Sequence, residues 1–345
     1  MKVLYIGGLK RSDGTKKNSY FEYLALKKIY KNIEQLNPDN FFIIPSISKR
    51  IFYNISPKII EPLLNCFFLS HIKKNYDLIY VNSTSASYIG KKLIRNLKKK
   101  SNKIITLIND NPFTSRDKKR WKLYLEAAKY YNLTASYYKS RILMGKKVGI
   151  KNILLINPPY QKKVHARKKI SNKQKKIISN DVVVIATWFP ERGIFFKKLI
   201  EKGLDIKIYG NKWDKDENYS LIKSNIVLGH VDHPDYSKII QCAKISICLP
   251  SKGNFDGITR RSIEIPAIGT FLLAKRSQEH KDYFVENKEA VFFNNANDCY
   301  KKCLYYLRNN KLRNRIAKKG YIKVTRILKA DYETSIKTFI KNVKF

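Results

Sequence analysis

The chain has 345 residues, of which 43% are hydrophobic, so it is long enough for two domains with buried cores. Its 70 Lys and Arg against 27 Asp and Glu give a net charge of +43. Such a field attracts polyanions, whether nucleic acid, an anionic membrane or nucleotide diphosphates. The chain is also rich in Lys, Asn, Ile and Tyr, as expected of an AT-rich genome, and this compositional drift explains the charge equally well. No apolar run approaches the length of a bilayer span, and Lys2 leads directly into a predicted strand, so no signal peptide is expected.

Residues 1–160 alternate apolar strands with amphipathic helices, a pattern typical of a doubly wound parallel sheet. Strands are expected at 3–6, 41–44, 78–81, 104–108, 133–136 and 153–156, and helices near 18–36, 57–74, 86–100, 117–130 and 139–148. The apolar helix at 59–72 is interpreted as a core or interface helix. A membrane-surface helix flanked by Lys58, Lys73 and Lys74 is the alternative.

Two loops of this half follow predicted strands, where α/β sheets place working residues. The first strand ends in Gly7 and Gly8, which either lie against a phosphate or sugar or form only a tight turn. The dinucleotide pattern Gly-x-Gly-x-x-Gly is absent. Asp110 follows the strand at 104–108 and is a candidate to orient an acceptor hydroxyl or act as a base, the alternative being an Asx turn or helix cap.

A lysine-rich stretch at 161–180 follows two prolines and is interpreted as a linker. The second half then begins with a strand at 182–186 and a loop that ends in Arg192 and Gly193, before a helix to 202. This order would put the Arg192 cation near a diphosphate, unless the residue only caps a surface helix. Another strand, at 204–208, leads into Gly210, and a third is expected at 226–228 before a helix near 235–242.

The stretch from Asp256 to Thr270 organises the second half. A buried strand at 245–249 precedes it, a helix is expected to begin near Ile258, and a strand at 271–273 follows. Strand, glycine loop and helix present backbone N–H groups to an anion, with Gly257, Thr259 and Arg261 at the turn. Asp256 and Glu264, with seven residues between them, would accept hydrogen bonds from hydroxyls. The arrangement suits a nucleotide-sugar; the alternative is an ordinary helix with Glu264 in solvent.

The remaining chain predicts a helix near 277–286, a strand at 290–293, a helix near 297–309 and a helical tail at 322–345. The five cysteines lie at 66, 242, 248, 299 and 303 without a Cys-x-x-Cys pair, which favours reduced, buried thiols. A metal site at the His230-Val231-Asp232-His233 turn is not expected, because no cysteines cluster with it.

Several of these runs resemble known glycosyltransferases. The two acids with seven residues between them resemble family 4 glycosyltransferases of the GT-B fold, whose first acid is usually Glu where this chain has Asp256. The run 261–273 is similar to the spore-maturation (CgeB-like) glycosyltransferases, as are the segments 182–193 and 204–213 and the strand at 289–293. The catalytic histidine motif of the first domain is absent.

The resemblance implies a GT-B fold: two Rossmann-like, doubly wound parallel-sheet domains facing a cleft. Residues 1–160 would form the acceptor side, 161–180 a basic linker, 181–325 the donor domain and 326–345 a helix returning to the first domain. Within the donor site, Arg192, Gly193, Gly210, Gly257, Thr259 and Arg261 would surround the diphosphate. Glu264 would hold the ribose and Asp256 the sugar, with Gly7 and Gly8 closing over the donor and Asp110 serving the acceptor.

The implied activity is sugar transfer from a nucleotide-diphosphate sugar to a glycan or lipid-linked acceptor, in cell-surface polysaccharide or glycoconjugate synthesis, without a metal or other cofactor. A cytoplasmic location is expected, including the inner face of an anionic membrane. Two other classes stay open: an inactive GT-B scaffold, and a nucleic-acid-binding protein. The dispersed basic residues and the absence of a nucleic-acid motif argue against the last.

Overall fold

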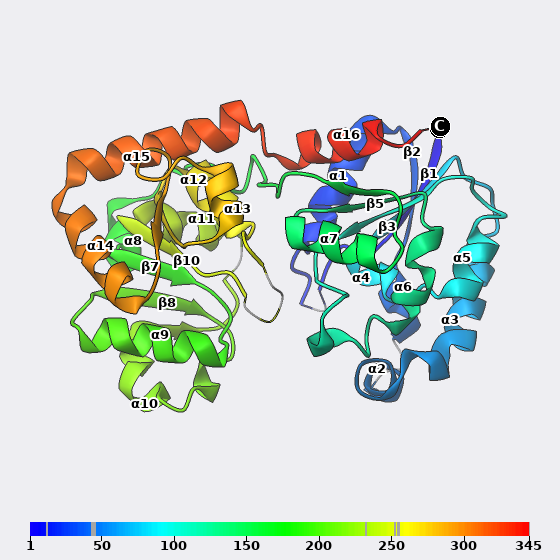
Figure 1. Cartoon of the computed structure of the whole chain (residues 1–345), viewed down its shortest axis with the longest axis horizontal. Helices are drawn as coiled ribbons and strands as arrows, with labels where there is room; N and C mark the ends of the chain where they lie inside the picture. Colours follow the sequence, from blue (N-terminus) through cyan, green and yellow to red (C-terminus); the bar gives the residue numbers. More distant parts are fainter. Residues whose placement is uncertain (12, 43–45, 232, 252, 254–255, 345) are drawn as a thin grey trace. The chain divides into compact units, whose positions relative to one another are not determined.

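The computed structural model describes all residues of the chain except 12, 43–45, 232, 252, 254–255 and 345. The chain divides into two compact units, each an α/β unit built on a parallel sheet (Figure 1). Unit 1 comprises Met1–Asn157, Ser251–Asp256 and Tyr332–Phe345. Unit 2 comprises Pro158–Pro250 and Gly257–Asp331. The chain therefore passes from one sheet to the other and returns at its C-terminal helix.

The sheet of unit 1 has, among the described residues, six parallel strands in the order β2-β1-β3-β4-β5-β6. They are β1 (Lys2–Ile6), β2 (Asn32–Leu36), β3 (Leu78–Asn82), β4 (Ile104–Ile108), β5 (Leu133–Ser136) and β6 (Ile153–Leu155). Every residue of β3 and β4 is buried, as expected for central strands covered by helices on both faces.

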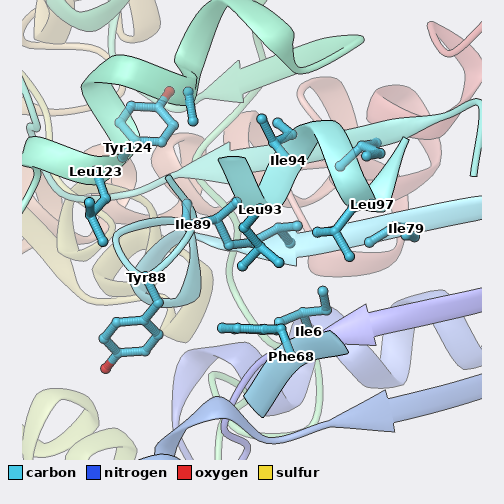
Figure 2. Packing of buried hydrophobic residues seen from close by; sticks show 14 of the residues in the cluster. Ile6, Phe68, Ile79, Tyr88, Ile89, Leu93, Ile94, Leu97, Leu123 and Tyr124 are labelled. Carbon is cyan, nitrogen blue, oxygen red and sulfur yellow. The ribbon is translucent and has the colours of Figure 1, made fainter. Parts of the chain in front are cut away.

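The helices of unit 1 are α1 (Asn18–Ile29), α2 (Ser46–Arg50), α3 (Pro57–His71), α4 (Ser83–Ala86), α5 (Lys91–Leu97), α6 (Lys122–Ala127), α7 (Lys139–Lys147) and α16 (Tyr332–Lys341). The core beneath them is apolar, and Figure 2 shows Phe68 of α3 lying toward Ile6 of β1, with Leu93 and Leu97 of α5 packed nearby. The C-terminal helix α16 packs on α1, where the Phe21 and Tyr332 rings are 5.7 Å apart.

The prediction of a strand at 41–44 is wrong. Phe41 and Phe42 lie in a 3-10 helix, Pro38–Phe42, and residues 43–44 fall outside the described residues. The strand is β2, within the stretch predicted as helical at 18–36, and it pairs with β1. Its sequence, Asn-Ile-Glu-Gln-Leu, suits an edge strand whose polar side chains meet water, so apolar periodicity does not reveal it. Phe42 instead packs on the Tyr88 ring, 5.3 Å away.

The sheet of unit 2 also has six parallel strands among the described residues, in the order β12-β11-β10-β7-β8-β9. They are β7 (Val182–Ile185), β8 (Ile206–Gly210), β9 (Ile226–Leu228), β10 (Ile245–Cys248), β11 (Phe271–Lys275) and β12 (Val291–Phe293). All six were predicted from the sequence to within a few residues. From β7 the sheet grows one way to β8 and the other way to β10, so the topological switch point lies between β7 and β10. Ligands of open α/β sheets bind outside the carboxyl ends of strands at such a point.

The helices of unit 2 are α8 (Asn172–Ile178), α9 (Pro190–Glu201), α10 (Tyr219–Ile222), α11 (His233–Cys242), α12 (Arg261–Ile268), α13 (Gln278–Tyr283), α14 (Ala296–Arg308) and α15 (Asn310–Ile322). Cys299 and Cys303 of α14 are fully buried, as predicted. The prediction of buried thiols is wrong for Cys66, which is exposed because it lies on the side of α3 turned away from the core, and Cys242 is only partly buried. Among the described residues no cluster of three or more His, Cys, Asp or Glu has the geometry to hold a metal ion.

Candidate functional site at the β7–β10 switch point

Arg192 joins the ends of the two strands that flank the switch point. It lies in the first turn of α9 and is only 5% exposed. One terminal nitrogen donates to the Thr187 carbonyl after β7, at 2.6 Å, and the other donates to the Leu249 carbonyl after β10, at 2.9 Å. The alternative of a surface helix cap is therefore wrong, because the guanidinium is buried and fixes two loops. Arg192, which the sequence predicted as a cation of the site, therefore lies at the switch point, where open α/β sheets bind ligands.

The helix α12 begins at Arg261, three residues later than predicted. Ile258 is fully buried in the preceding loop rather than helical. The Ser262 hydroxyl accepts a hydrogen bond from the Thr259 N–H at 3.2 Å, and this bond holds Thr259 in the turn before the helix. The Glu264 N–H then donates to the Arg260 carbonyl at 2.8 Å, which closes the first helical turn. The helix start thus lies directly beyond the end of β10.

Positive charge gathers around Cys248, the last residue of β10. Arg192 and Arg261 both act on its thiol, yet burial dominates and raises the pKa of Cys248, so the thiol stays protonated. The Cys248 sulfur lies 3.2 Å from the Thr259 hydroxyl. The Nε of Arg261 is buried and has no hydrogen-bond partner within the described part of the chain. A buried donor without a partner costs free energy, so this cation is suited to receive an anion.

Glu264 is enclosed rather than solvated, so the alternative of a solvent-exposed carboxylate is wrong. Its side chain is 12% exposed, and Oε2 accepts a hydrogen bond from the Tyr236 hydroxyl at 2.8 Å. Burial alone would raise the pKa of the Glu264 carboxyl, but His165, Arg260 and Arg261, with the Tyr236 bond, outweigh it and hold the pKa below its usual range. Glu264 is therefore ionised at neutral pH and can accept hydrogen bonds from ligand hydroxyls.

His165 is a site residue that the sequence did not indicate. Its Nε2 lies 3.9 Å from Oε1 of Glu264, and its ring is 5.6 Å from the Tyr236 ring. Nδ1 accepts a hydrogen bond from the Gln161 N–H at 2.9 Å, so the proton of the neutral ring is on Nε2, toward Glu264. A cavity of about 760 Å³ borders this histidine on the side of Gly269, at the C-terminal end of α12. His165 thus lines that cavity and lies close to the Glu264 carboxylate.

His280 forms hydrogen bonds that hold the loop before α12 in place. It is fully buried at the start of α13, with Nδ1 2.9 Å from the Ser277 hydroxyl and Nε2 2.8 Å from the Ser262 hydroxyl. Ser277 in turn donates to the Gly257 carbonyl. One neutral imidazole therefore connects both ends of the segment Gly257–Ser262. Burial lowers the pKa of His280 to about 4.

The depressed pKa of His280 predicts a pH-dependent stability. The unfolded chain protonates this histidine near 6.5, whereas the folded protein keeps it neutral to about 4. Its contribution is complete above about pH 6.5 and is lost as the pH falls toward 4, by up to about 3 kcal/mol. Melting temperatures measured across this window should fall less steeply for His280→Gln than for the wild type. His71→Gln, at an exposed histidine, is the control, and equal slopes for wild type and His280→Gln would contradict the assignment.

Packing within unit 2 explains three glycines that the sequence analysis assigned to the donor. A side chain at Gly193 would overlap the Asp216 carboxylate, which also accepts a hydrogen bond from Trp188 Nε1 at 2.6 Å. A side chain at Gly257 would lie 2.8 Å from the Glu279 carboxyl carbon. A side chain at Gly210, where φ is +153°, would overlap the Ala186 carbonyl oxygen. A direct role of these glycines in donor binding stays a prediction.

Gly210→Ala is expected to destabilise unit 2 by about 3 kcal/mol, because strain at a positive φ adds to overlap with a backbone oxygen that cannot rotate away. Gly203→Ala is the matched control, since Gly203 has φ +79° but no atom within 4 Å of the added carbon. That control should cost only about 1 kcal/mol. Urea denaturation of both variants measures the difference, and equal losses would show that the Ala186 contact is unimportant.

Gly7, Gly8 and Asp110, three of the predicted residues of unit 1, lie in two loops. The Gly7–Gly8 turn is closed by side chains: Gln35 donates to the Gly7 carbonyl at 2.7 Å, and Ser19 donates to the Gly8 carbonyl at 2.5 Å. Asp110 follows β4, has a side chain 44% exposed, and lies 3.7 Å from Arg120. Its carboxylate is therefore accessible to a ligand, and its role as a base stays a prediction.

Asp256 has a partner that the sequence analysis missed. Its carboxylate forms a 2.7 Å ion pair with Arg141 of α7, and the two side chains are 8% and 1% exposed. The Arg141 guanidinium also lies 3.6 Å from the centre of the Tyr138 ring. Asp256 belongs to unit 1 and Glu264 to unit 2, so the joint action of these two carboxylates stays a prediction.

Comparison with known proteins places this site in context. Residues 192–340 match a family model described as glycosyl transferase-like, and the match begins at Arg192 and includes α12. No curated protein matches the chain by sequence. Among solved structures, the sucrose-phosphate synthase of Thermosynechococcus elongatus is similar over 99% of this chain and 98% of its own, with a TM-score of 0.74 and 11% identity.

Two further structures are similar along 99% of both chains. Alr3699/HepE of Anabaena, solved in complex with UDP-glucose, has a TM-score of 0.66 and 10% identity. The trehalose-6-phosphate synthase OtsA has a TM-score of 0.68 and 12% identity. These similarities and the two doubly wound parallel sheets confirm the predicted GT-B fold. The similarity to the CgeB-like group stays a prediction.

Proposed function

We propose that this protein is a glycosyltransferase that transfers a sugar from a nucleotide-diphosphate sugar to an acceptor hydroxyl. The observation that carries the proposal lies beyond the carboxyl end of β10: the enclosed, ionised carboxylate of Glu264 occurs together with the buried guanidinium of Arg192 and with Arg261, whose Nε is buried. Glu264 supplies the acceptor of hydroxyl hydrogen bonds, and Arg192 and Arg261 supply the cations. The match of residues 192–340 to a glycosyl transferase-like family supports the same reading.

In this proposal, negative charge that develops on the leaving diphosphate is stabilised by Arg261 and by the N–H groups at the start of α12. Arg192 already donates to two carbonyls, so its main task is to hold the loops after β7 and β10 at their separation. His280 performs the corresponding task for the loop before α12. Because fixed cations supply the charge stabilisation, we propose that transfer needs neither a metal ion nor another cofactor.

Glu264 would bind the ribose hydroxyls of the donor. Its carboxylate is oriented by Tyr236 on one oxygen and faced by His165 on the other, so its geometry is fixed before the ligand arrives. Asp256, with Arg141 holding its carboxylate, is proposed to contact the sugar, and Asp110 to accept the proton of the acceptor hydroxyl. UDP is the first nucleotide to test, because Alr3699/HepE was solved with UDP and with UDP-glucose.

The test is release of nucleoside diphosphate from a panel of UDP-, GDP-, ADP-, CDP- and dTDP-sugars, with and without glycan and lipid-linked acceptors. We expect one donor to be cleaved, faster with acceptor than without it, and with the same rate in EDTA. Leu221→Gln, at an exposed residue of α10, is a control that should retain full activity. Tight binding of a donor without turnover under any condition would favour the inactive-scaffold alternative and overturn the proposal.

A further inference from the structure

One face of α3 in unit 1 is both apolar and exposed. Ile59, Leu63 and Leu69 are 59%, 62% and 37% exposed, and Ile55, just before the helix, is 57% exposed. At 100° per residue, the exposed residues from Lys58 to Ser70 fall within an arc of roughly 140° on one side of the helix. Pro62 and Cys66 share this arc and are also exposed. We call these residues the outer face of α3.

The opposite side of α3 already has its partners. Ile60, Leu64 and Phe68 are buried in the core of unit 1, and Phe68 lies toward β1 (Figure 2). The Ser56 hydroxyl accepts a hydrogen bond from the Lys58 N–H at 3.3 Å, which caps the helix. The helix is therefore anchored by its inner side, and its outer face is not explained by the packing of unit 1. A surface helix of a globular protein normally turns polar residues to this side.

Exposed basic residues lie before and after α3 in the chain, and we call them the basic rim. Lys49 and Arg50 are exposed at the end of α2, and Lys73 is exposed just beyond the C-terminus of α3. Lys119 donates to the Asn54 carbonyl at 3.2 Å, which holds a fourth cation beside the N-terminal end of the helix.

Neither Glu126 of α6 nor Glu61 of α3 itself belongs to the outer arc. Glu126 of α6 is engaged in a 2.6 Å ion pair with Lys58. Glu61 points toward Gly90, and burial raises its pKa above the usual range. The outer face therefore presents aliphatic side chains within a rim of net positive charge.

We propose that the outer face of α3 binds the surface of an anionic bilayer. An anionic bilayer complements this face in two ways. Its acyl chains can contact the aliphatic residues, and its negative headgroups can bind the basic rim. A second copy of the chain matches it poorly, because in a symmetric dimer the same rim of cations would face itself, and the whole chain carries +43.

The geometry fits a helix that lies in the plane of the membrane. With 15 residues α3 is about 22 Å long, and within the described residues no helix combines the length and apolar character needed to cross a bilayer. The inference does not depend on the proposed glycosyl transfer, since it concerns only a surface of unit 1. If both hold, lipid-linked acceptors become the first class to test.

The experiment is flotation of the full chain with phosphatidylcholine vesicles that contain or lack phosphatidylglycerol. We expect binding only to the anionic vesicles. The double variant Ile59→Gln, Leu63→Gln should lower the partition coefficient by about tenfold or more, because two aliphatic side chains no longer enter the interface. Leu221→Gln, which is 61% exposed in unit 2, should bind like the wild type. Lys49→Gln with Lys73→Gln should weaken binding most strongly at low salt.

Three results would overturn the inference. Equal binding by the wild type and the Ile59→Gln, Leu63→Gln variant would show that charge alone attracts the protein to vesicles. Equal binding to neutral and anionic vesicles would remove the role of the basic rim. A concentration-dependent dimer of the wild type that the double variant abolishes would assign the outer face to a contact between copies. Unchanged melting temperatures of the variants exclude loss of folding as the cause, and donor cleavage in the absence of vesicles should stay at the wild-type rate.

Discussion

Replacing Arg261 by alanine is expected to lower kcat/KM for the donor by about a hundredfold to a thousandfold, the effect of removing one well-placed stabiliser of transition-state charge. The reason lies in its position at the first residue of α12, with a buried Nε that has no hydrogen-bond partner in the described chain. A diphosphate leaving group develops its charge as the bond to the sugar breaks, so the loss should fall mainly on kcat.

Arg308→Ala is the matched control for Arg261→Ala. It removes the same charge from an exposed position near the end of α14, so it tests whether the general positive field of the chain is sufficient. Steady-state kinetics of nucleotide release from both variants make the comparison. Equal activities would show that Arg261 acts only through long-range attraction, and the proposed site would then lose its main cation.

Glu264→Gln should raise KM for the donor by about tenfold to a hundredfold while kcat changes less. Gln keeps the shape and the hydrogen bond with Tyr236 but removes the charge, and a hydrogen bond to a charged group contributes about 1.5–3 kcal/mol. Because His165 and two arginines hold the pKa of this carboxyl below its usual range, the charge is present at neutral pH and its loss is felt there. Stability should also fall, because the interactions that hold the pKa of this carboxyl low stabilise the folded protein.

Glu201→Gln, at an exposed carboxylate of α9, controls for the change in net charge. Initial rates at varied donor concentration separate KM from kcat for both variants. An unchanged KM in Glu264→Gln would mean that the carboxylate serves only the packing of Tyr236 and His165, and the ribose contact would have to be sought elsewhere.

The fold was largely predictable because its signal is local. In unit 2 each strand is a short apolar run bounded by polar loops, and β7, β10 and β11 were placed to within a residue or two at their starts. The edge strand β2 was missed, because half of its side chains meet water and its sequence carries no apolar alternation. Phe41 and Phe42 gave a misleading strand signal, since their burial comes from a 3-10 helix packed on the core.

The candidate site was predictable only in part. Arg192 and Arg261 stood out because each lies at the start of a helix next to a glycine loop, and Glu264 stood out because seven residues separate it from Asp256. Their environment depends on residues distant in sequence: Tyr236 reaches Glu264 from α11, and His280 reaches Ser262 from α13. A single histidine or tyrosine has no spacing that marks it, so tertiary packing alone brings these partners together.

Calorimetric titration of the wild type and Glu264→Gln with UDP, GDP, ADP, CDP and dTDP, each with and without EDTA, tests whether the β7–β10 switch point holds a donor site. One nucleotide should bind saturably to the wild type, EDTA should leave this binding unchanged, and Glu264→Gln should weaken it by at least about tenfold. Equal binding of all five nucleotides, or equal affinity in the variant, would show that the charge of the chain attracts any anion and that the switch point holds no donor site.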